Sequence, residues 1–201
     1  MQPVYDLLHK QLCKELVLHA DETTLQVLKE PGRSSTSKSY IWLYRTSGCA
    51  KQAIVLYEYQ RTPSVSCKAS RAGCTRTDTR GIISCRGTSV WWAAGRMQGE
   101  NLTRYLEDGR LELSNNRAER SMKPFVMGRK NWLFANTPGG AQASSVIYSL
   151  IETAKENGLD PYRYLLWVLR NAPQLSETNK AWAEKLLPAN APEECYVLQN
   201  N

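Results

Sequence analysis

The sequence lacks features that would place it in several common classes. No apolar run approaches the roughly 18 residues that a membrane-spanning helix needs, and charged residues interrupt the N-terminus every few positions. Cys13, Cys49 and Cys195 are isolated, and Cys67, Cys74 and Cys85 form no C-x-x-C pair and have no neighbouring histidine, so no structural zinc site is expected. We therefore expect a cytoplasmic protein with free thiols and no membrane partner.

Positive charge is in excess but unevenly placed. The net charge is +7 over 201 residues, and a basic surface gains affinity for nucleic acid by releasing counterions. Residues 66–99 hold six basic side chains and one acidic one, so five of the seven net charges fall there. The overall charge is therefore weak support for DNA binding.

Hydrophobic periodicity predicts an α/β fold. Apolar residues spaced along 4–16 predict a helix, and the runs "LVLHADETTLQVL", "SYIWLYRTS" and "AIVLYEYQ" predict three strands of an antiparallel meander. Later helices are predicted in "SNNRAERSMKPFVMGRK", where Pro124 would shorten or kink the helix, in the run that Gly158 closes, and after Asp160. A last helix over 176–187 and a loose tail after Pro188 would complete a C-terminal helical region.

Two carboxylates stand out as candidates for chemistry. Asp21 follows apolar residues of the first strand, so its side chain either caps a turn or projects from the sheet into a cleft. Glu119 lies on a predicted helix with several basic residues, so it is either a solvated salt-bridging residue or part of a site. Brought together, such carboxylates bind Mg²⁺ for phosphoryl transfer, and adjacent arginines position phosphates.

Two long blocks of the sequence resemble the transposases of the insertion sequence 66 family. The first includes "VLHADETTLQVL" and "IVLYEYQ", and the second runs from "LEDGRLELSNNRAERSMKPFVMGRK" through "YRYLLWVL". The resemblance implies a partial ribonuclease H-like domain, an Asp-Asp-Glu triad that cuts and joins DNA with Mg²⁺ or Mn²⁺, and a bacterial cytoplasmic protein that binds transposon ends and can form a homo-oligomer. By motif, Asp21 is the first Asp and Glu119 the Glu, and both would bind metal.

The same helix supplies the residues that we expect to contact DNA. They are the basic side chains of the motif and of the positions that follow it, namely Arg117, Arg120, Lys123, Arg129 and Lys130.

The family's second Asp is missing, and the genetic code accounts for its absence. This Asp normally lies in a motif like "HTDGY", followed by one like "CWAH", and neither motif occurs. From Ser66 onward, the last base of each codon can be joined to the first two bases of the next codon. The codons formed in this way can encode the sequence "LHTDGYAGYHKLPGDIRVVGCWAH". In the shifted frame the codon that spans Trp91 and Trp92 can encode only Val, and the codon that spans Trp92 and Ala93 can encode only Gly. Both residues are those of the family pattern. We interpret residues 66–99 as family DNA translated out of frame, so Asp78 is not assigned to the triad.

These departures divide the chain into four parts. Residues 1–65 are the N-terminal part of the catalytic domain, and 66–99 are the out-of-frame segment. Residues 100–135 hold the Glu-bearing helix and the end of the catalytic domain, and 136–201 form the C-terminal helical region. A helical segment is expected to be deleted near Gly99, and an upstream DNA-binding part to be absent before Met1. The predicted function is DNA transposition, inactive in this chain. The alternatives are a non-catalytic DNA- or transposase-binding fragment and no function. We also expect 66–99 to make few long-range contacts and to complete no sheet.

Overall fold

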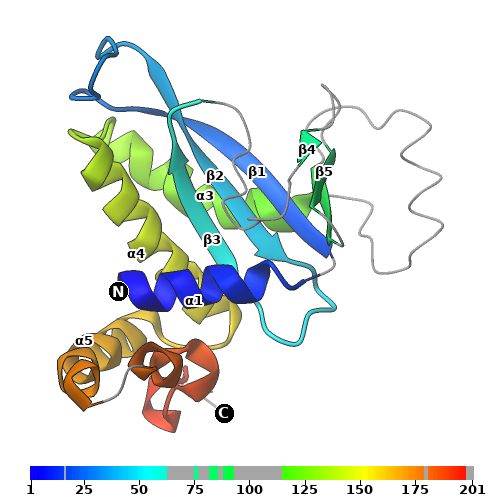
Figure 1. Cartoon of the computed structure of the whole chain (residues 1–201), viewed down its shortest axis with the longest axis vertical. Coiled ribbons are helices and arrows are strands. Elements are labelled where there is room, and N and C mark those ends of the chain that lie inside the picture. Colours follow the sequence, from blue (N-terminus) through cyan, green and yellow to red (C-terminus); the bar gives the residue numbers. More distant parts are fainter. Residues whose placement is uncertain are drawn as a thin grey trace.

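The computed structural model describes residues 1–15, 17–62, 75–76, 82–85, 88–92, 115–178 and 181–197. It is an α/β structure in which the predicted meander forms the middle and one edge of a sheet (Figure 1). Strands β1 (Val17–Gln26), β2 (Lys38–Thr46) and β3 (Val55–Gln60) pair antiparallel in chain order. Their β-branched and aromatic content favours this arrangement, so the three predicted strands are confirmed.

The other side of β1 carries three short strands from the segment that we interpret as out of frame. Strand β6 (Thr88–Trp92) pairs parallel to β1, and β5 (Ile82–Cys85) and β4 (Thr75–Arg76) continue the sheet antiparallel. The expectation that 66–99 would complete no sheet is therefore wrong. Sheet pairing joins main-chain groups, and residues such as Ile and Val favour strands whatever their origin. Asp78 lies outside the described residues.

Four α-helices are described, and all four lie where periodicity predicts a helix. They are α1 (Gln2–Leu12), α3 (Asn116–Trp132), α4 (Pro138–Glu156) and α5 (Pro161–Thr178). Helix α3 continues through Pro124 rather than stopping there, and Gly158 follows α4 with a φ of 74°, as expected for a helix-ending glycine. No helix in the described ranges is long and apolar enough to span a membrane.

The C-terminal prediction is wrong in two respects. The predicted helix over 176–187 is replaced by the end of α5 and a 3-10 helix, η1 (Trp182–Leu186). The tail is not loose, because η2 (Pro188–Asn190) and η3 (Glu193–Cys195) follow and Cys195 is buried. The main-chain N–H of Asp160 donates to the carbonyl of Cys195 at 2.7 Å, which holds the tail against the start of α5.

The sheet separates two hydrophobic cores. Even-numbered residues of β1, such as Leu18 and Ala20, pack in the core that α1, α4, α5 and η1 share. Leu25 and its neighbours on β2 and β3 face α3, through Met122 and Phe125 among others. Because side chains alternate along a strand, the odd-numbered residues of β1, including Asp21, lie on the α3 face.

Helix α4 covers the open edge of β3 with polar side chains. Thr153 accepts from the N–H of Val55 and donates to its carbonyl, at 3.0 and 2.9 Å, and Ser149 accepts from the N–H of Tyr57 at 2.8 Å. The Tyr5 hydroxyl donates to the Tyr57 carbonyl at 3.0 Å. These bonds satisfy main-chain groups that an edge strand would otherwise expose.

Candidate active site

Asp21 lies on β1 at the first position beyond the pairing with β6. That parallel pairing ends at Ala20 and Trp92, whereas β1 continues beside β2 with Asp21 opposite Leu43. Leu43 belongs to the core beneath α3, so the Asp21 side chain lies on the same face. One carboxylate oxygen of Asp21 accepts from the N–H of Glu22 at 2.8 Å. The local sequence thus places a half-buried carboxylate next to the last residue of β1 that pairs with β6.

Helix α3 is attached to β1 at both ends. The Asn115 side-chain amide donates to the Ala20 carbonyl at 3.0 Å, and the Arg129 guanidinium donates to the Thr23 hydroxyl at 3.0 Å. At 100° per residue, positions 115, 119, 122, 126 and 129 form one stripe along a helix. Glu119 therefore lies on the side of α3 that faces β1, between two anchored residues.

The charge of Glu119 acts on the Asp21 carboxylate. Burial raises the pKa of Asp21 above its usual value, and the negative charge of Glu119 raises it further. The hydrogen bond from the Glu22 N–H acts in the opposite direction. Glu119 is itself exposed at the surface, and its negative charge acts on the half-buried Asp21.

The residues present fit a single hard cation better than a pair. Mg²⁺ prefers oxygen ligands and is commonly held by one or two carboxylates with water completing its shell. Beside the two carboxylates, the side-chain oxygen of Asn115 is buried without a hydrogen-bond partner, and an amide oxygen is a suitable ligand. Within the described ranges no group of three or more His, Cys, Asp or Glu side chains is placed to hold a metal.

Asn115 is a residue that the sequence analysis missed. It occupies the N-cap position of α3, where Asn normally accepts from the helix main chain, but its side chain makes no capping bond. It bonds instead to β1, 95 residues away in the chain. No local pattern could have revealed a contact of that kind.

The predicted DNA-contacting residues do not all share one role. Arg117, Arg120, Lys123 and Lys130 are exposed on α3. Arg129 is only half-exposed, and its guanidinium also contacts the carbonyl and hydroxyl of Thr24. Arg129 therefore fastens α3 to β1, whereas the others leave their charge at the surface.

Arg45 on β2 also positions the helix and was not predicted from the sequence. It is 2% exposed and lies opposite His19, so it is on the α3 face. Its guanidinium donates to the Arg117 carbonyl at 3.2 Å, to the Ser121 hydroxyl, and to both carboxylate oxygens of Glu156 on α4. The turn of α3 that carries Glu119 is thereby held against the sheet.

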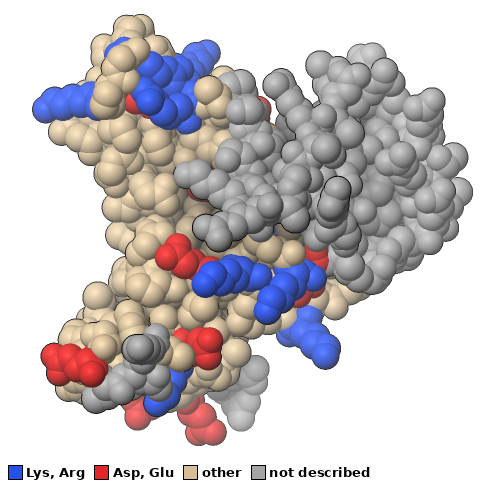
Figure 2. Space-filling model, viewed as in Figure 1, with Lys and Arg blue, Asp and Glu red and all other residues tan. Residues whose placement is uncertain are grey.

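A buried carboxylate organises the loop between β1 and β2. Glu30 has a side chain only 1% exposed and pairs with Arg33 at 3.0 Å and Arg61 at 3.4 Å. Burial alone would raise the pKa of Glu30, but hydrogen bonds from Tyr59 and Ser39 and the two guanidinium groups lower it overall. Figure 2 shows basic side chains gathered at the end of the molecule where this loop lies.

Comparison with known proteins places the chain in a family. The family model described as "Transposase IS66 family" matches residues 1–91 and 91–143, and the model described as "IS66 C-terminal element" matches residues 149–189. The two pieces of the first match meet inside the segment that we interpret as out of frame. No solved structure matches the chain significantly.

The curated relatives are much longer than this chain. "Uncharacterized protein y4jD" of Sinorhizobium fredii is 42% identical over 89 residues, which is 44% of this chain and 17% of that protein. "Uncharacterized protein y4qI" of the same organism is 40% identical over 75 residues, 37% of this chain and 14% of that protein. The matches thus span less than a fifth of these relatives. Because the family models cover most of its length, the chain belongs to the IS66 transposase family.

Proposed function

We propose that this site belongs to the machinery of DNA transposition by metal-dependent phosphoryl transfer, and that Asp21 and Glu119 are two of its three carboxylates. The observation that carries the proposal is that Asp21 is half-buried on the face of β1 that α3 covers, where burial raises its pKa and the negative charge of Glu119 on α3 raises it further. Family membership supplies the reaction class.

The strand arrangement supports a ribonuclease H-like fold for the catalytic part. The resemblance implies a ribonuclease H-like domain with an antiparallel meander, and the order β3-β2-β1-β6 contains that meander together with a strand parallel to β1. We propose the boundaries 1–65, 66–99, 100–135 and 136–201 for the four parts of the chain. The C-terminal part then begins at the turn before α4.

The chemistry required of the protein is mostly positioning. Divalent metal supplies charge stabilisation and an activated nucleophile in such reactions. Asp21 would bind the cation from the sheet and Glu119 from the helix. The amide oxygen of Asn115, buried and without a hydrogen-bond partner, would add a neutral ligand. Arg117, Arg120, Lys123 and Lys130 would contact the DNA backbone beside the site, since exposed basic groups bind phosphate without reading sequence.

We propose that this chain does not cleave DNA. The third carboxylate of the triad belongs to a motif that its reading frame does not encode, and catalytic groups that act as a unit lose most of their effect when one is removed. The chain would then bind Mg²⁺ or Mn²⁺ weakly without holding two ions in the geometry for transfer.

Metal binding tests the site without requiring activity. We expect the purified chain to bind Mn²⁺, which is measured as a decrease in the paramagnetic resonance signal of the free ion. Asp21→Asn and Glu119→Gln should each weaken this binding by at least about tenfold. Glu22→Gln is the matched control, because residue 22 is adjacent in sequence but faces the other side of β1. Equal affinity in all four proteins would show that the carboxylates hold no metal.

Cleavage assays test the reaction class. Labelled transposon-end DNA should not be nicked by the present chain, whereas a frame-restored chain should regain part of the activity. Restored activity that survives Glu119→Gln would show that Glu119 is not the Glu of the triad. Metal-dependent nicking by the present chain that Asp21→Asn abolishes would contradict the proposed inactivity.

A further inference from the structure

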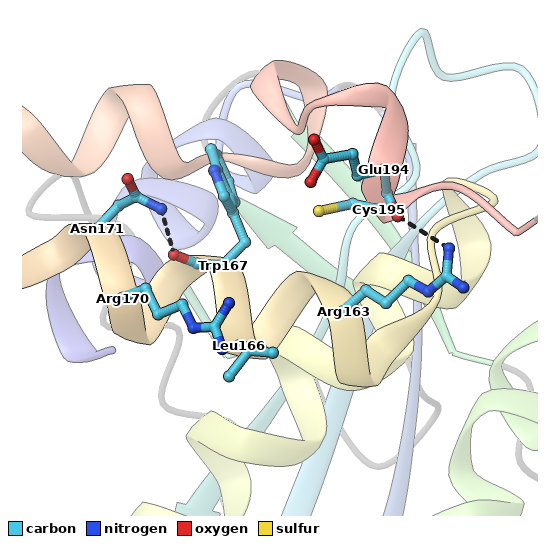
Figure 3. A pocket seen from close by; sticks show the side chains of 7 residues that line it. All are labelled: Arg163, Leu166, Trp167, Arg170, Asn171, Glu194 and Cys195. Carbon is cyan, nitrogen blue, oxygen red and sulfur yellow. Dashed lines mark hydrogen bonds between the residues drawn. The ribbon is translucent and has the colours of Figure 1, made fainter.

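A cavity lies between α5 and the 3-10 helix η3, far along the chain from Asp21. Its volume is about 420 Å³, within the range of small-ligand pockets. Figure 3 shows that Arg163, Trp167 and Arg170 line it from α5, while Glu194 and Cys195 line it from η3. None of these residues belongs to the site described above.

The spacing of these residues along α5 creates one mixed face. Arg163, Trp167 and Arg170 are separated by four and then three positions, which places them on one side of a helix. The Trp167 ring is partly buried and packs beside Tyr164, with ring centroids 6.1 Å apart. Trp167 is thus a fixed aromatic wall, with a guanidinium on either side of it along the helix.

The two guanidinium groups differ in what they already bind. Arg163 donates one bond to the Glu194 carbonyl at 3.2 Å, which ties α5 to η3. Arg170 is exposed and makes no hydrogen bond or ion pair with any residue in the described part of the chain. Its donors are available to an anion at the edge of the cavity.

We propose that this cavity binds one unpaired nucleotide of a DNA strand. The base would lie against the Trp167 indole, and the adjoining phosphate would bind Arg170. Stacking on an aromatic ring combined with a cationic contact to the backbone is the common mode of single-strand binding. Asn171 and Glu194 also line the cavity, and their side-chain oxygens can accept from a ring N–H or amino group on the base's Watson–Crick edge.

The shape and chemistry favour a nucleotide over other occupants. A paired base in a duplex cannot stack on the Trp167 indole without leaving its partner. An acidic peptide would use the arginines but would place a carboxylate beside that of Glu194 and leave the indole without a flat partner. The choice of DNA as ligand rests on the proposed function, whereas the cavity itself uses neither Asp21 nor Glu119.

Binding to labelled oligothymidine in EDTA tests the proposal without the metal site. Trp167→Leu should weaken binding by about 5- to 100-fold, the range expected for losing one base–aromatic stack, and Trp167→Phe should retain most of it. Arg170→Ala should reduce the slope of affinity against salt by about 0.7, as for one lost phosphate contact on a single strand. Lys185→Ala is the matched control, since Lys185 is basic and exposed in η1 but does not line the cavity.

Modified DNA makes the test independent of how well each variant folds. An oligonucleotide of abasic residues keeps the phosphates and loses the bases, so it should bind the unaltered chain about as weakly as oligothymidine binds Trp167→Leu. Duplex DNA binding as tightly as the single strand would overturn the proposal. The proposal would also be overturned if oligothymidine bound with equal affinity to the Arg170→Ala, Trp167→Phe, Trp167→Leu and Lys185→Ala proteins. Displacement of the DNA by an equal concentration of oligoglutamate would overturn it as well. Loss of Mn²⁺ binding in Asp21→Asn with normal oligothymidine binding would affect only the proposed function.

Discussion

Arg45 should be a positioning residue for the candidate site. Its guanidinium contacts the Arg117 carbonyl and the Ser121 hydroxyl, two residues before and two residues after Glu119. Arg45→Met keeps a long side chain of similar volume while removing the charge and all donors. We predict that this variant is less stable by about 2–4 kcal/mol and binds Mn²⁺ about 10- to 100-fold more weakly.

The magnitude follows from what each partner loses. The Ser121 hydroxyl is buried, so it costs about 1–3 kcal/mol when left without its donor. The Arg117 carbonyl lies within α3 and keeps its helical partner, so losing its second hydrogen bond costs about 1 kcal/mol. Glu156 has a side chain 30% exposed, so water can replace Arg45 there. Methionine also avoids the desolvation that a buried guanidinium requires. The predicted loss of stability is therefore no larger than the roughly 3–5 kcal/mol that breaking a fully buried ion pair costs.

Two measurements on the same protein separate stability from positioning. Urea unfolding gives the change in free energy, and Mn²⁺ titration of the folded protein gives the change in affinity. Lys155→Met is the matched control, because its ammonium pairs with Glu152 while remaining 50% exposed. Such a pair contributes about 1 kcal/mol or less, and both of its residues lie on α4.

Either of two results would refute the assignment of Arg45. A loss of stability below about 1 kcal/mol, equal to that of the control, would mean that the hydrogen bonds around Arg45 contribute little. A large loss of stability with unchanged Mn²⁺ affinity would mean that Arg45 supports the core but does not position Glu119.

Three further predictions concern single side chains. Because the folded-state pKa of Glu30 is lowered, its contribution is present above the unfolded pKa and lost on acidification. The free energy of unfolding of Glu30→Gln should therefore be about 3 kcal/mol lower than that of the unaltered chain at neutral pH. Urea titrations at lower pH should show a smaller difference between the two proteins. The pKa of Asp21 is raised instead, so its ionised carboxylate destabilises the folded chain at neutral pH. Asp21→Asn should therefore be more stable than the unaltered chain by about 0.5–2 kcal/mol at neutral pH and equally stable in acid. In Gly128→Ala the added Cβ would lie 2.3 Å from the Tyr148 hydroxyl, so the melting temperature should fall although Ala favours helices.

Local patterns predicted the elements that carry the two carboxylates. Strand β1 alternates between two cores, and α3 carries apolar residues at helical spacing, so both could be identified from the sequence. Pro124 did not end α3, since contacts with the sheet outweigh the loss of one helical hydrogen bond. The assignment of Asp21 and Glu119 came from motif resemblance rather than from periodicity.

The residues that hold the site together could not be predicted in the same way. Asn115 contacts Ala20 across 95 positions and Arg45 contacts Glu156 across 111. Such pairings depend on how the elements pack, and periodicity reports only which face of each element is buried. The C-terminal 3-10 helices were missed for a related reason, because short turns of this kind have weak local signals.

The described contacts that position the two carboxylates lie entirely within residues 17–46 and 115–156, apart from the pairing of β1 with β6. Asn115, Arg129 and Arg45 fasten α3 to β1 and β2 with no side chain from the segment interpreted as out of frame. The reading frame of 66–99 should therefore change the number of carboxylates at the site but not the approach of Asp21 to Glu119. We predict that the present chain binds one Mn²⁺ and that the frame-restored chain binds two, measured by titration under the same conditions. Equal stoichiometry in the two chains would show that the restored motif contributes no ligand, and binding of two ions by the present chain would show that the site is complete without it.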